Sequence, residues 1–234
     1  MAAVPDPRQG VFETLLVADG HPVELEAHLS RLTGSLDELF PSLVVPDLDQ
    51  MDVQAENGAV RIDVVPRTGR FDAWTSFREI EQRPETPALY SLQIPGGLGA
   101  HKWRDRSLLE TQPPNEGLPL ILDENTVLEA ARANVFCVHA ETLRTPPTDG
   151  RILPGVTRTR VLELAGKVGI DTHEAELSRA DLLAADEVFL TGSVRGIERI
   201  ESLDGAPIGG TGEISERLAT ELQLAWTATK TALR

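Results

Sequence analysis

Four short β-rich runs in the middle of this 234-residue chain constrain its fold more than any other feature. Turn-forming residues separate the runs, which cover residues 118–123, 126–129, 134–139 and 142–145. Runs this short and this closely spaced are typical of antiparallel sheets that curve into a barrel or sandwich. The sequence therefore predicts a barrel-like β-structure in the C-terminal part of the chain.

Helical patterns accompany these strands, so that part of the chain is predicted to be α/β. Pro154 and Gly155 end a loop, and apolar residues at helical spacing follow them. The other elements expected after residue 88 are strands at 89–95, 171–177 and 186–193, and helices at 104–111, 178–185 and 213–233.

The N-terminal part has a different pattern. Asp19-Gly20 between two β-rich runs predicts a hairpin, and residues 26–40 place leucines at helical spacing before Pro41. We also expect a short helix at 47–56 and strands at 58–66 and 72–80. The polar, proline-containing segment 80–87 is the predicted linker. The prediction is an α+β chain of two domains, residues 1–84 and 85–234.

Charge and cysteine usage exclude several classes of protein. The formal net charge of −15 argues against binding to nucleic acid or to an anionic membrane surface. Local arginines can still hold a small anionic substrate. The single cysteine, Cys137, permits no internal disulfide and fits a reducing compartment. The first residues lack a signal-peptide pattern and no apolar run reaches membrane-spanning length, so we expect a cytoplasmic protein.

Lysine chemistry has few candidates, because the chain holds three lysines: Lys102, Lys167 and Lys230. Lys102 follows a glycine-rich run, and glycines let the backbone approach a ligand closely. Burial beside Arg104 and Arg106 would lower its pKa, as an amine nucleophile requires. A surface lysine in a basic stretch explains the same position, so both alternatives stay open here.

Four further residues suggest a phosphate and a heterocyclic ring. Thr157 begins a helix and Ser193 ends a strand, two positions that can bind phosphate. Arg31 can bind phosphate through two N–H groups, and Glu129 could lie beside a pyridinium nitrogen. Each also has an ordinary explanation: a capping threonine, a turn serine, a solvated arginine and a helix-capping or solvent-facing glutamate.

Other catalytic patterns are missing from the sequence. No dinucleotide-binding glycine fingerprint, P-loop or nucleophile elbow is present. The five histidines have no spacing that suits a metal site, so we expect no metal.

Taken in order, the segments GVFETLLV, HLSRL, HKWRDR, LEAARANVF, ILPGVTR and LTGSVRGIERI resemble the fold type IV enzymes that depend on pyridoxal 5′-phosphate (PLP). That family contains branched-chain and D-amino acid aminotransferases and 4-amino-4-deoxychorismate lyase. The resemblance runs from about Gly10 to Leu203. It implies PLP as cofactor, a small N-terminal α+β domain, a C-terminal barrel-like α/β domain and a homodimer.

The resemblance also implies a role for individual residues. Lys102 would be the Schiff-base lysine, and Glu129 would bind the pyridine nitrogen. The remaining cofactor-binding residues would be Arg31, Val156, Thr157 and Ser193 at the phosphate, Leu153 under the ring, and Asn134 as a structural partner.

Within the family, the nearest resemblance is to aminodeoxychorismate lyase. Two features of this chain carry that resemblance: the Lys-x-x-x-Arg spacing of Lys102 and Arg106, and a likeness to the lyase module fused to some aminodeoxychorismate synthases. We therefore expect a lyase that acts on an anionic amine. An aminotransferase for branched-chain or D-amino acids, or a non-catalytic partner of the synthase, stays open. The candidate substrate ligands are Arg106, Thr14, Arg195, Arg67 and Arg158. Arg132 stays open as a ligand of a substrate carboxylate or as a surface charge.

Overall fold

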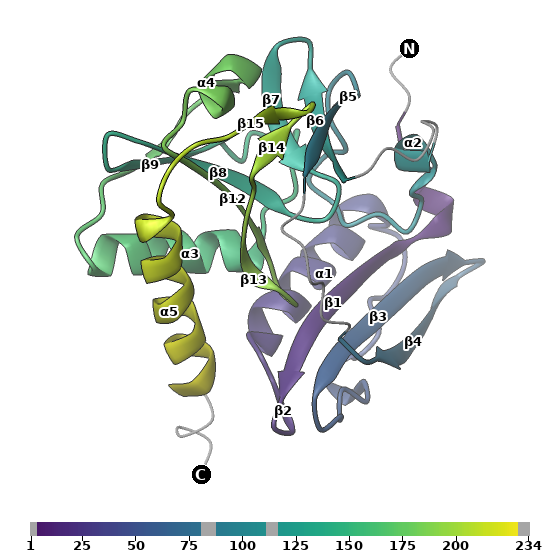
Figure 1. Cartoon of the computed structure of the whole chain (residues 1–234). Coiled ribbons are helices and arrows are strands. Elements are labelled where there is room, and N and C mark those ends of the chain that lie inside the picture. Colours follow the sequence, from purple (N-terminus) through teal and green to yellow (C-terminus); the bar gives the residue numbers. More distant parts are fainter. Residues whose placement is uncertain (1–3, 81–87, 111–116, 229–234) are drawn as a thin grey trace.

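The computed structural model describes residues 4–80, 88–110 and 117–228. An N-terminal sheet with one helix lies beside a C-terminal body of two sheets and further helices (Figure 1). This arrangement confirms the predicted α+β class with a barrel-like C-terminal part. The predicted linker, apart from Ile80, lies outside the described residues.

The N-terminal sheet has four strands in the order β2-β1-β3-β4. They are β1 (Val11–Ala18), β2 (His21–Pro22), β3 (Gly58–Arg67) and β4 (Arg70–Arg78). Helix α1 (Leu25–Leu39) packs against β1, and Leu15, Leu32 and Ile62 are fully buried between helix and sheet. Burial of this leucine face explains why residues 26–40 form a helix.

The C-terminal body contains a five-stranded sheet, β10-β9-β8-β12-β13, and a six-stranded sheet, β11-β7-β6-β5-β14-β15. The strands of the first are β8 (Asn134–His139), β9 (Thr142–Thr145), β10 (Thr172–Glu174), β12 (Glu187–Gly192) and β13 (Gly196–Arg199). Those of the second are β5 (Leu89–Gln93), β6 (Leu118–Asp123), β7 (Thr126–Ala130), β11 (Leu177–Ser178), β14 (Ser202–Leu203) and β15 (Ala206–Pro207).

Strand β8 shows how the layers are held together. Alternate side chains of a strand point to opposite faces of the sheet. Val135 and Cys137 therefore pack into the core shared with the six-stranded sheet, whereas Phe136 packs on the other face. There it stacks on Phe189 at 5.2 Å between ring centroids, under helices α3 (Val156–Lys167) and α5 (Glu213–Ala228).

Several sequence predictions of single elements were wrong. Residues 47–56 contain only a 3-10 turn, Leu48–Gln50, because aspartates there bond locally, as when Gln54 N donates to the Asp52 carboxylate. The helix expected at 104–111 is the single turn α2 (Ser107–Glu110). The strand expected at 171–177 is divided into β10 and β11, because the chain passes from one sheet to the other there.

Other predictions were right in kind but not in extent. Strand β1 pairs chiefly with β3, and the hairpin partner β2 has two residues. Helix α4 (Arg179–Leu183) begins with a capping box between Ser178 and Asp181. Strands β13, β14 and β15 were not predicted. No helix within the described ranges is both long enough and apolar enough to span a bilayer.

Candidate active site

A cavity opens where the N-terminal unit meets the C-terminal sheets. Its empty volume is about 610 Å³, including the part open to solvent. Its lining includes most of the residues predicted from sequence: Arg31, Lys102, Arg106, Glu129, Asn134, Leu153, Val156, Thr157 and Ser193. Arg31 and Ser193, which are 162 positions apart in the chain, thus line the same cavity.

The backbone around Lys102 is held by the start of β1. Phe12 N donates to the Lys102 carbonyl at 2.9 Å, and Arg104 N donates to the Gly10 carbonyl at 3.1 Å. Trp103 inserts into the N-terminal core, and its indole N–H donates to the Leu98 carbonyl at 2.7 Å. The N-terminal unit therefore fixes the position of the lysine.

The glycine-rich run before Lys102 packs tightly on the loop before α3. Gly97 has a φ of +73°, and a Cβ there would lie 2.2 Å from the Arg151 carbonyl oxygen. Only glycine satisfies both the conformation and the space. The sequence predicted that these glycines let the backbone approach a ligand closely. In the structure, the close neighbour of Gly97 is the protein backbone at Arg151.

The amine of Lys102 is buried, and its pKa is lowered. Burial lowers the pKa of Lys102 to about 8, with Arg31 and Arg106 acting in the same direction and Glu13 and Glu129 opposing it. A larger fraction of this amine is therefore neutral at physiological pH than of an ordinary lysine. The amine nitrogen lies 5.1 Å from the centroid of the Phe12 ring, which is a cation–π distance for the ammonium form.

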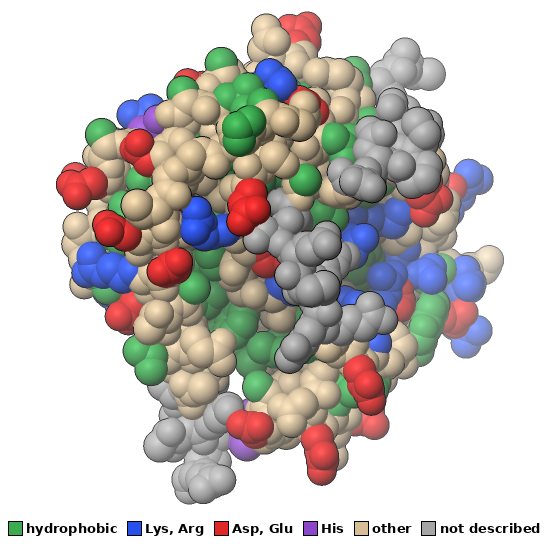
Figure 2. All heavy atoms as spheres, viewed as in Figure 1, with side chains coloured by type: hydrophobic (Ala, Val, Ile, Leu, Met, Phe, Trp, Pro, Cys, Tyr) green, Lys and Arg blue, Asp and Glu red, His purple; other side chains and the backbone are tan. Residues whose placement is uncertain are grey.

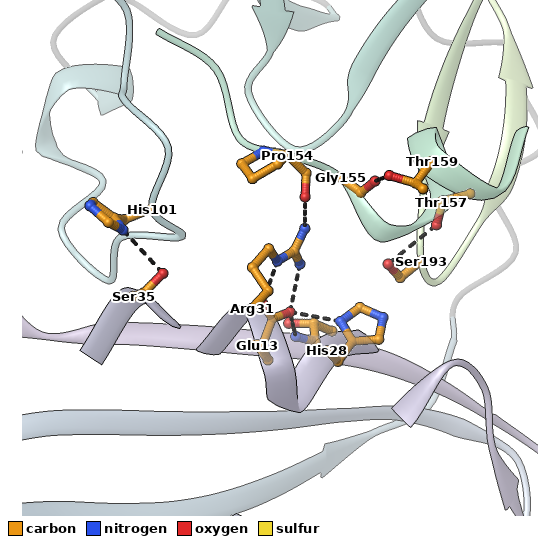
Figure 3. A network of polar contacts seen from close by, with 11 residues as sticks. Glu13, His28, Arg31, Ser35, His101, Pro154, Gly155, Thr157, Thr159 and Ser193 are labelled. Atoms are coloured by element: carbon orange, nitrogen blue, oxygen red, sulfur yellow. Dashed lines mark hydrogen bonds and ion pairs between the residues drawn. The ribbon is translucent and has the colours of Figure 1, made fainter. Parts of the chain in front are cut away.

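Arg31 enters the cavity from α1 (Figure 3). Its Nε and one terminal nitrogen donate to the Glu13 carboxylate at 2.7 and 2.8 Å, and the other terminal nitrogen donates to the Pro154 carbonyl at 2.8 Å. His28 Nδ1 lies 2.8 Å from the same carboxylate. Burial alone would raise the pKa of Glu13, but Arg31 and His28 outweigh it and lower the pKa to about 2.

A candidate anion site faces Arg31 at the N-terminus of α3. The Gly155 cap supplies no side-chain hydrogen bond, so the first N–H groups of the helix are available to a ligand. The Thr157 and Ser193 hydroxyls lie beside this terminus, 3.3 Å apart (Figure 3). A guanidinium, two hydroxyls and a helix N-terminus together form a donor set that suits a phosphate.

Asn134 secures the loop that leads into this helix. Its side-chain amide donates to the Leu153 carbonyl at 2.9 Å. A Cβ at Gly155 would lie 2.0 Å from the Asn134 amide oxygen, so Gly155 is required by space rather than by its backbone angles. Asn134 thus contacts the loop before α3, and its role at the cofactor site stays a prediction.

Glu129 is a buried carboxyl group at the cavity wall. The Leu153 N–H donates to it at 3.2 Å. Burial raises the pKa of Glu129 to about 8, although the Leu153 N–H, Lys102 and Arg106 oppose this effect. At neutral pH the carboxyl therefore carries a proton that a basic ring nitrogen could take.

Arginines gather on one side of the cavity. Arg106 and Arg132 line it, and the Arg106 guanidinium donates to the Ala131 carbonyl. Burial and the nearby charges of Arg132 and Arg61 lower the pKa of Arg106. Arg61 and Arg104 share the buried carboxylate of Asp63, with nitrogen–oxygen distances of 2.7 Å each.

Some residues near the cavity were not predicted from sequence, and some expected substrate ligands do not line the cavity. Glu13 lies in the segment GVFETLLV, but neither Glu13 nor Arg61 was predicted to be a site residue. Of the expected substrate ligands, Thr14 on β1 and Arg195 after β12 are not among the described residues that line the cavity. Arg158 is buried against Glu174 and the Pro146 carbonyl, and Arg67 pairs with Asp72 at the β3–β4 turn.

Comparisons with known proteins agree on the family. The family model described as amino-transferase class IV matches residues 80–203. A protein of Methanocaldococcus jannaschii with the provisional name branched-chain-amino-acid aminotransferase is 39% identical over 246 aligned positions. The alignment covers 89% of this chain and 84% of that protein. Branched-chain-amino-acid aminotransferase 6 of Arabidopsis thaliana is 39% identical over 101 residues, which cover 42% of this chain and 28% of that protein.

Solved structures share the whole fold. A hypothetical aminotransferase from Mycobacterium tuberculosis superposes with a TM-score of 0.81 and 26% identity, covering 94% of this chain and 89% of that one. The 4-amino-4-deoxychorismate lyase of Pseudomonas aeruginosa gives a TM-score of 0.77 and 26% identity, covering 95% and 96%. Together with the donor set above, which suits PLP, these matches establish that the chain belongs to the class IV aminotransferase family of PLP-dependent, fold type IV enzymes.

Proposed function

We propose that this enzyme is an aminodeoxychorismate lyase, which converts 4-amino-4-deoxychorismate to p-aminobenzoate and pyruvate. The observation that carries the proposal is the excess of arginine over carboxylate on one side of the cavity. A substrate with two carboxylates needs cations beyond those that bind the cofactor phosphate.

The local charge contrasts with that of the whole chain, which is −15. Near the cavity, Arg61 and Arg104 share one carboxylate, Asp63. Within the described residues, the acceptor of Arg106 is a backbone carbonyl rather than a carboxylate. Figure 2 shows Lys and Arg side chains gathered between the positions that α2 and β4 occupy in Figure 1. Such a local positive field concentrates anionic substrates.

The residues of the cavity would divide the work as follows. Arg31, Thr157, Ser193 and the α3 N-terminus would hold the cofactor phosphate. Bound PLP supplies an electron-withdrawing pyridinium ring. Glu129 would keep a proton at the ring nitrogen. Lys102 would hold the cofactor through its amine and, once displaced by the substrate amine, would take the proton from the carbon that bears the nitrogen.

A second candidate function is an aminotransferase for branched-chain or D-amino acids. It is favoured by the names of the relatives in Methanocaldococcus jannaschii and Arabidopsis thaliana. Both reactions share the proton removal by Lys102, so the substrate pocket decides between them.

The deciding experiment supplies enzymatically generated aminodeoxychorismate to the PLP-loaded enzyme and measures p-aminobenzoate. Release of p-aminobenzoate, lost in Lys102→Ala, would support the lyase. A parallel screen with L- and D-amino acids follows conversion of the cofactor to its pyridoxamine form. Rapid conversion without p-aminobenzoate would replace the lyase by the aminotransferase, and no reaction in either assay would favour a non-catalytic partner protein.

Arg106 is expected to set the affinity for a substrate with two carboxylates. Arg106→Gln should raise KM by about 10- to 100-fold with a smaller change in kcat, because a charged hydrogen bond is lost in binding. Arg67→Gln is the matched control, since Arg67 pairs with Asp72 outside the cavity. Steady-state kinetics of both variants would test this, and an unchanged KM in Arg106→Gln would remove Arg106 from the substrate site.

The low pKa of Lys102, about 8, predicts the pH dependence of cofactor uptake. Only the neutral amine attacks the PLP aldehyde, so the uptake rate of the apoprotein should fall about tenfold for each pH unit below about 8 and level off above it. Borohydride trapping at a series of pH values measures that rate. A rate that still rises above pH about 9 would mean an ordinary lysine pKa.

Partners follow from the same proposal. We propose a homodimer, as expected for the family, and treat association with aminodeoxychorismate synthase as an open alternative. Light scattering on the isolated protein and copurification with the synthase would test the two separately.

A further inference from the structure

Glu13 is a buried charged residue that does not line the cavity and that the proposed reaction does not use. It is 1% exposed, yet its carboxylate contacts Arg31, which does line the cavity. A buried charge is costly unless it is paired, and removal of its partner is costlier still. The position of this carboxylate therefore needs an explanation.

We propose that Glu13 is a positioning residue, which fixes the Arg31 guanidinium in the orientation that binds the cofactor phosphate. The proposal rests on the proposed role of Arg31 at that phosphate. It extends the cofactor site by a residue in the N-terminal sheet.

The geometry of Arg31 supports this role. A guanidinium has five N–H groups. Glu13 accepts from Nε and from one terminal nitrogen, and the Pro154 carbonyl accepts from the other terminal nitrogen. Two N–H groups, one on each terminal nitrogen, remain for a ligand. The plane of the guanidinium is thus fixed at three points before a phosphate arrives.

The third of these points connects Arg31 to the anion site. Pro154 immediately precedes Gly155, the N-cap of α3, and Thr157 lies in the first turn. In Figure 3, Arg31 lies between the Glu13–His28 pair on one side and Pro154 on the other, with Thr157 farther along the same loop and helix. Ser193, in the turn after β12, lies beside Thr157. Glu13 therefore sets the angle at which Arg31 meets the α3 N-terminus.

His28 completes the support from the side away from the cavity. Its Nδ1 lies 2.8 Å from Glu13 Oε2, and the ring is 1% exposed. An arginine without this support would lose more rotamer freedom on binding phosphate, which weakens binding. Pre-orientation by Glu13 removes part of that entropic cost.

A purely structural role for Glu13 is the competing explanation, since the same contacts attach α1 to β1. The two roles differ in what they do to ligands with and without a phosphate. Pyridoxal has the ring and aldehyde of PLP but lacks the phosphate. A positioning role acts on PLP alone and only through Arg31, whereas a structural role weakens both ligands.

The test measures dissociation constants of PLP and pyridoxal for wild type, Glu13→Gln, Glu13→Asp, Arg31→Gln and the Glu13→Asp/Arg31→Gln double variant. Glu13→Asp keeps the charge but is one methylene shorter, so it serves if the glutamine variant does not fold. Glu26→Gln, which changes an exposed carboxylate in the first turn of α1, is the control and should change neither dissociation constant. Thermal unfolding of each apoprotein verifies folding.

The expected result is a PLP dissociation constant raised about 10- to 100-fold in the Glu13 variants, with the pyridoxal constant changed less than about threefold. In the Arg31→Gln background, Glu13→Asp should then add less than about twofold. The positioning role would be overturned if the Glu13 variants bound PLP and pyridoxal more weakly by the same factor. It would also be overturned if Glu13→Asp weakened PLP binding as much in the Arg31→Gln background as in wild type. If Arg31→Gln leaves the ratio of the PLP and pyridoxal dissociation constants unchanged, the proposed role of Arg31 at the phosphate is wrong instead.

Discussion

Replacing Lys102 by alanine is expected to lower turnover by at least about 10³-fold, because one side chain would lose two roles. The amine that holds the cofactor disappears, and so does the base that takes the substrate proton. The structure favours this double role, since Lys102 lines the cavity with a pKa lowered to about 8.

The measurement combines turnover with borohydride trapping of PLP on the protein. Lys167→Ala is the matched control, since Lys167 is an exposed residue at the end of α3. Wild type and Lys167→Ala should both carry trapped cofactor, and Lys102→Ala should carry none. Trapping that persists in Lys102→Ala would place the cofactor on another amine.

The motif residues of the site could be predicted from sequence because each lies in a short local pattern. Thr157 and Val156 follow Gly155 at a helix start, and Lys102 follows its glycines. In each case the chemistry depends on the neighbouring backbone, which a few residues determine. The family resemblance then gave these fragments an order, and the cavity contains them together.

Residues that act through distant contacts could not be predicted in that way. Glu13 meets Arg31 across 18 positions, and Asp63 meets Arg104 across 41. Single acids or arginines in a strand give no signal, because a solvated charge produces the same sequence. Only the pairing of β1 with β3 and with the Lys102 segment brings these residues together.

The errors in the fold have a similar cause. Residues 171–177 have the composition of one strand, but Leu177 pairs with Val127 in the six-stranded sheet and Thr172 with Leu143 in the five-stranded sheet. Strands of two residues such as β14 and β15 are too short for a periodic pattern. Tertiary pairing decides these segments, and local propensity does not.

Glu129→Gln is expected to separate activity from stability. Glutamine cannot keep the ring nitrogen protonated, so turnover should fall about 10²-fold or more. The Glu129→Gln apoprotein should also be more stable than the wild-type apoprotein at alkaline pH, because the variant has no buried carboxyl at this position that can ionise. Burial raises the pKa of Glu129 from 4.5 to about 8, so the folded state favours the neutral acid. That contribution to stability is complete below the ordinary pKa and is lost as pH rises through about 8.

Glutamine stays neutral at every pH and avoids this loss. The Tm difference between Glu129→Gln and wild-type apoprotein should therefore grow by on the order of 5 °C between pH about 6 and about 9. Glu163→Gln, on the exposed face of α3, should show neither effect. Normal turnover in Glu129→Gln would remove Glu129 from the ring nitrogen. A pH-independent Tm difference would show that the carboxyl is already ionised in the folded apoprotein.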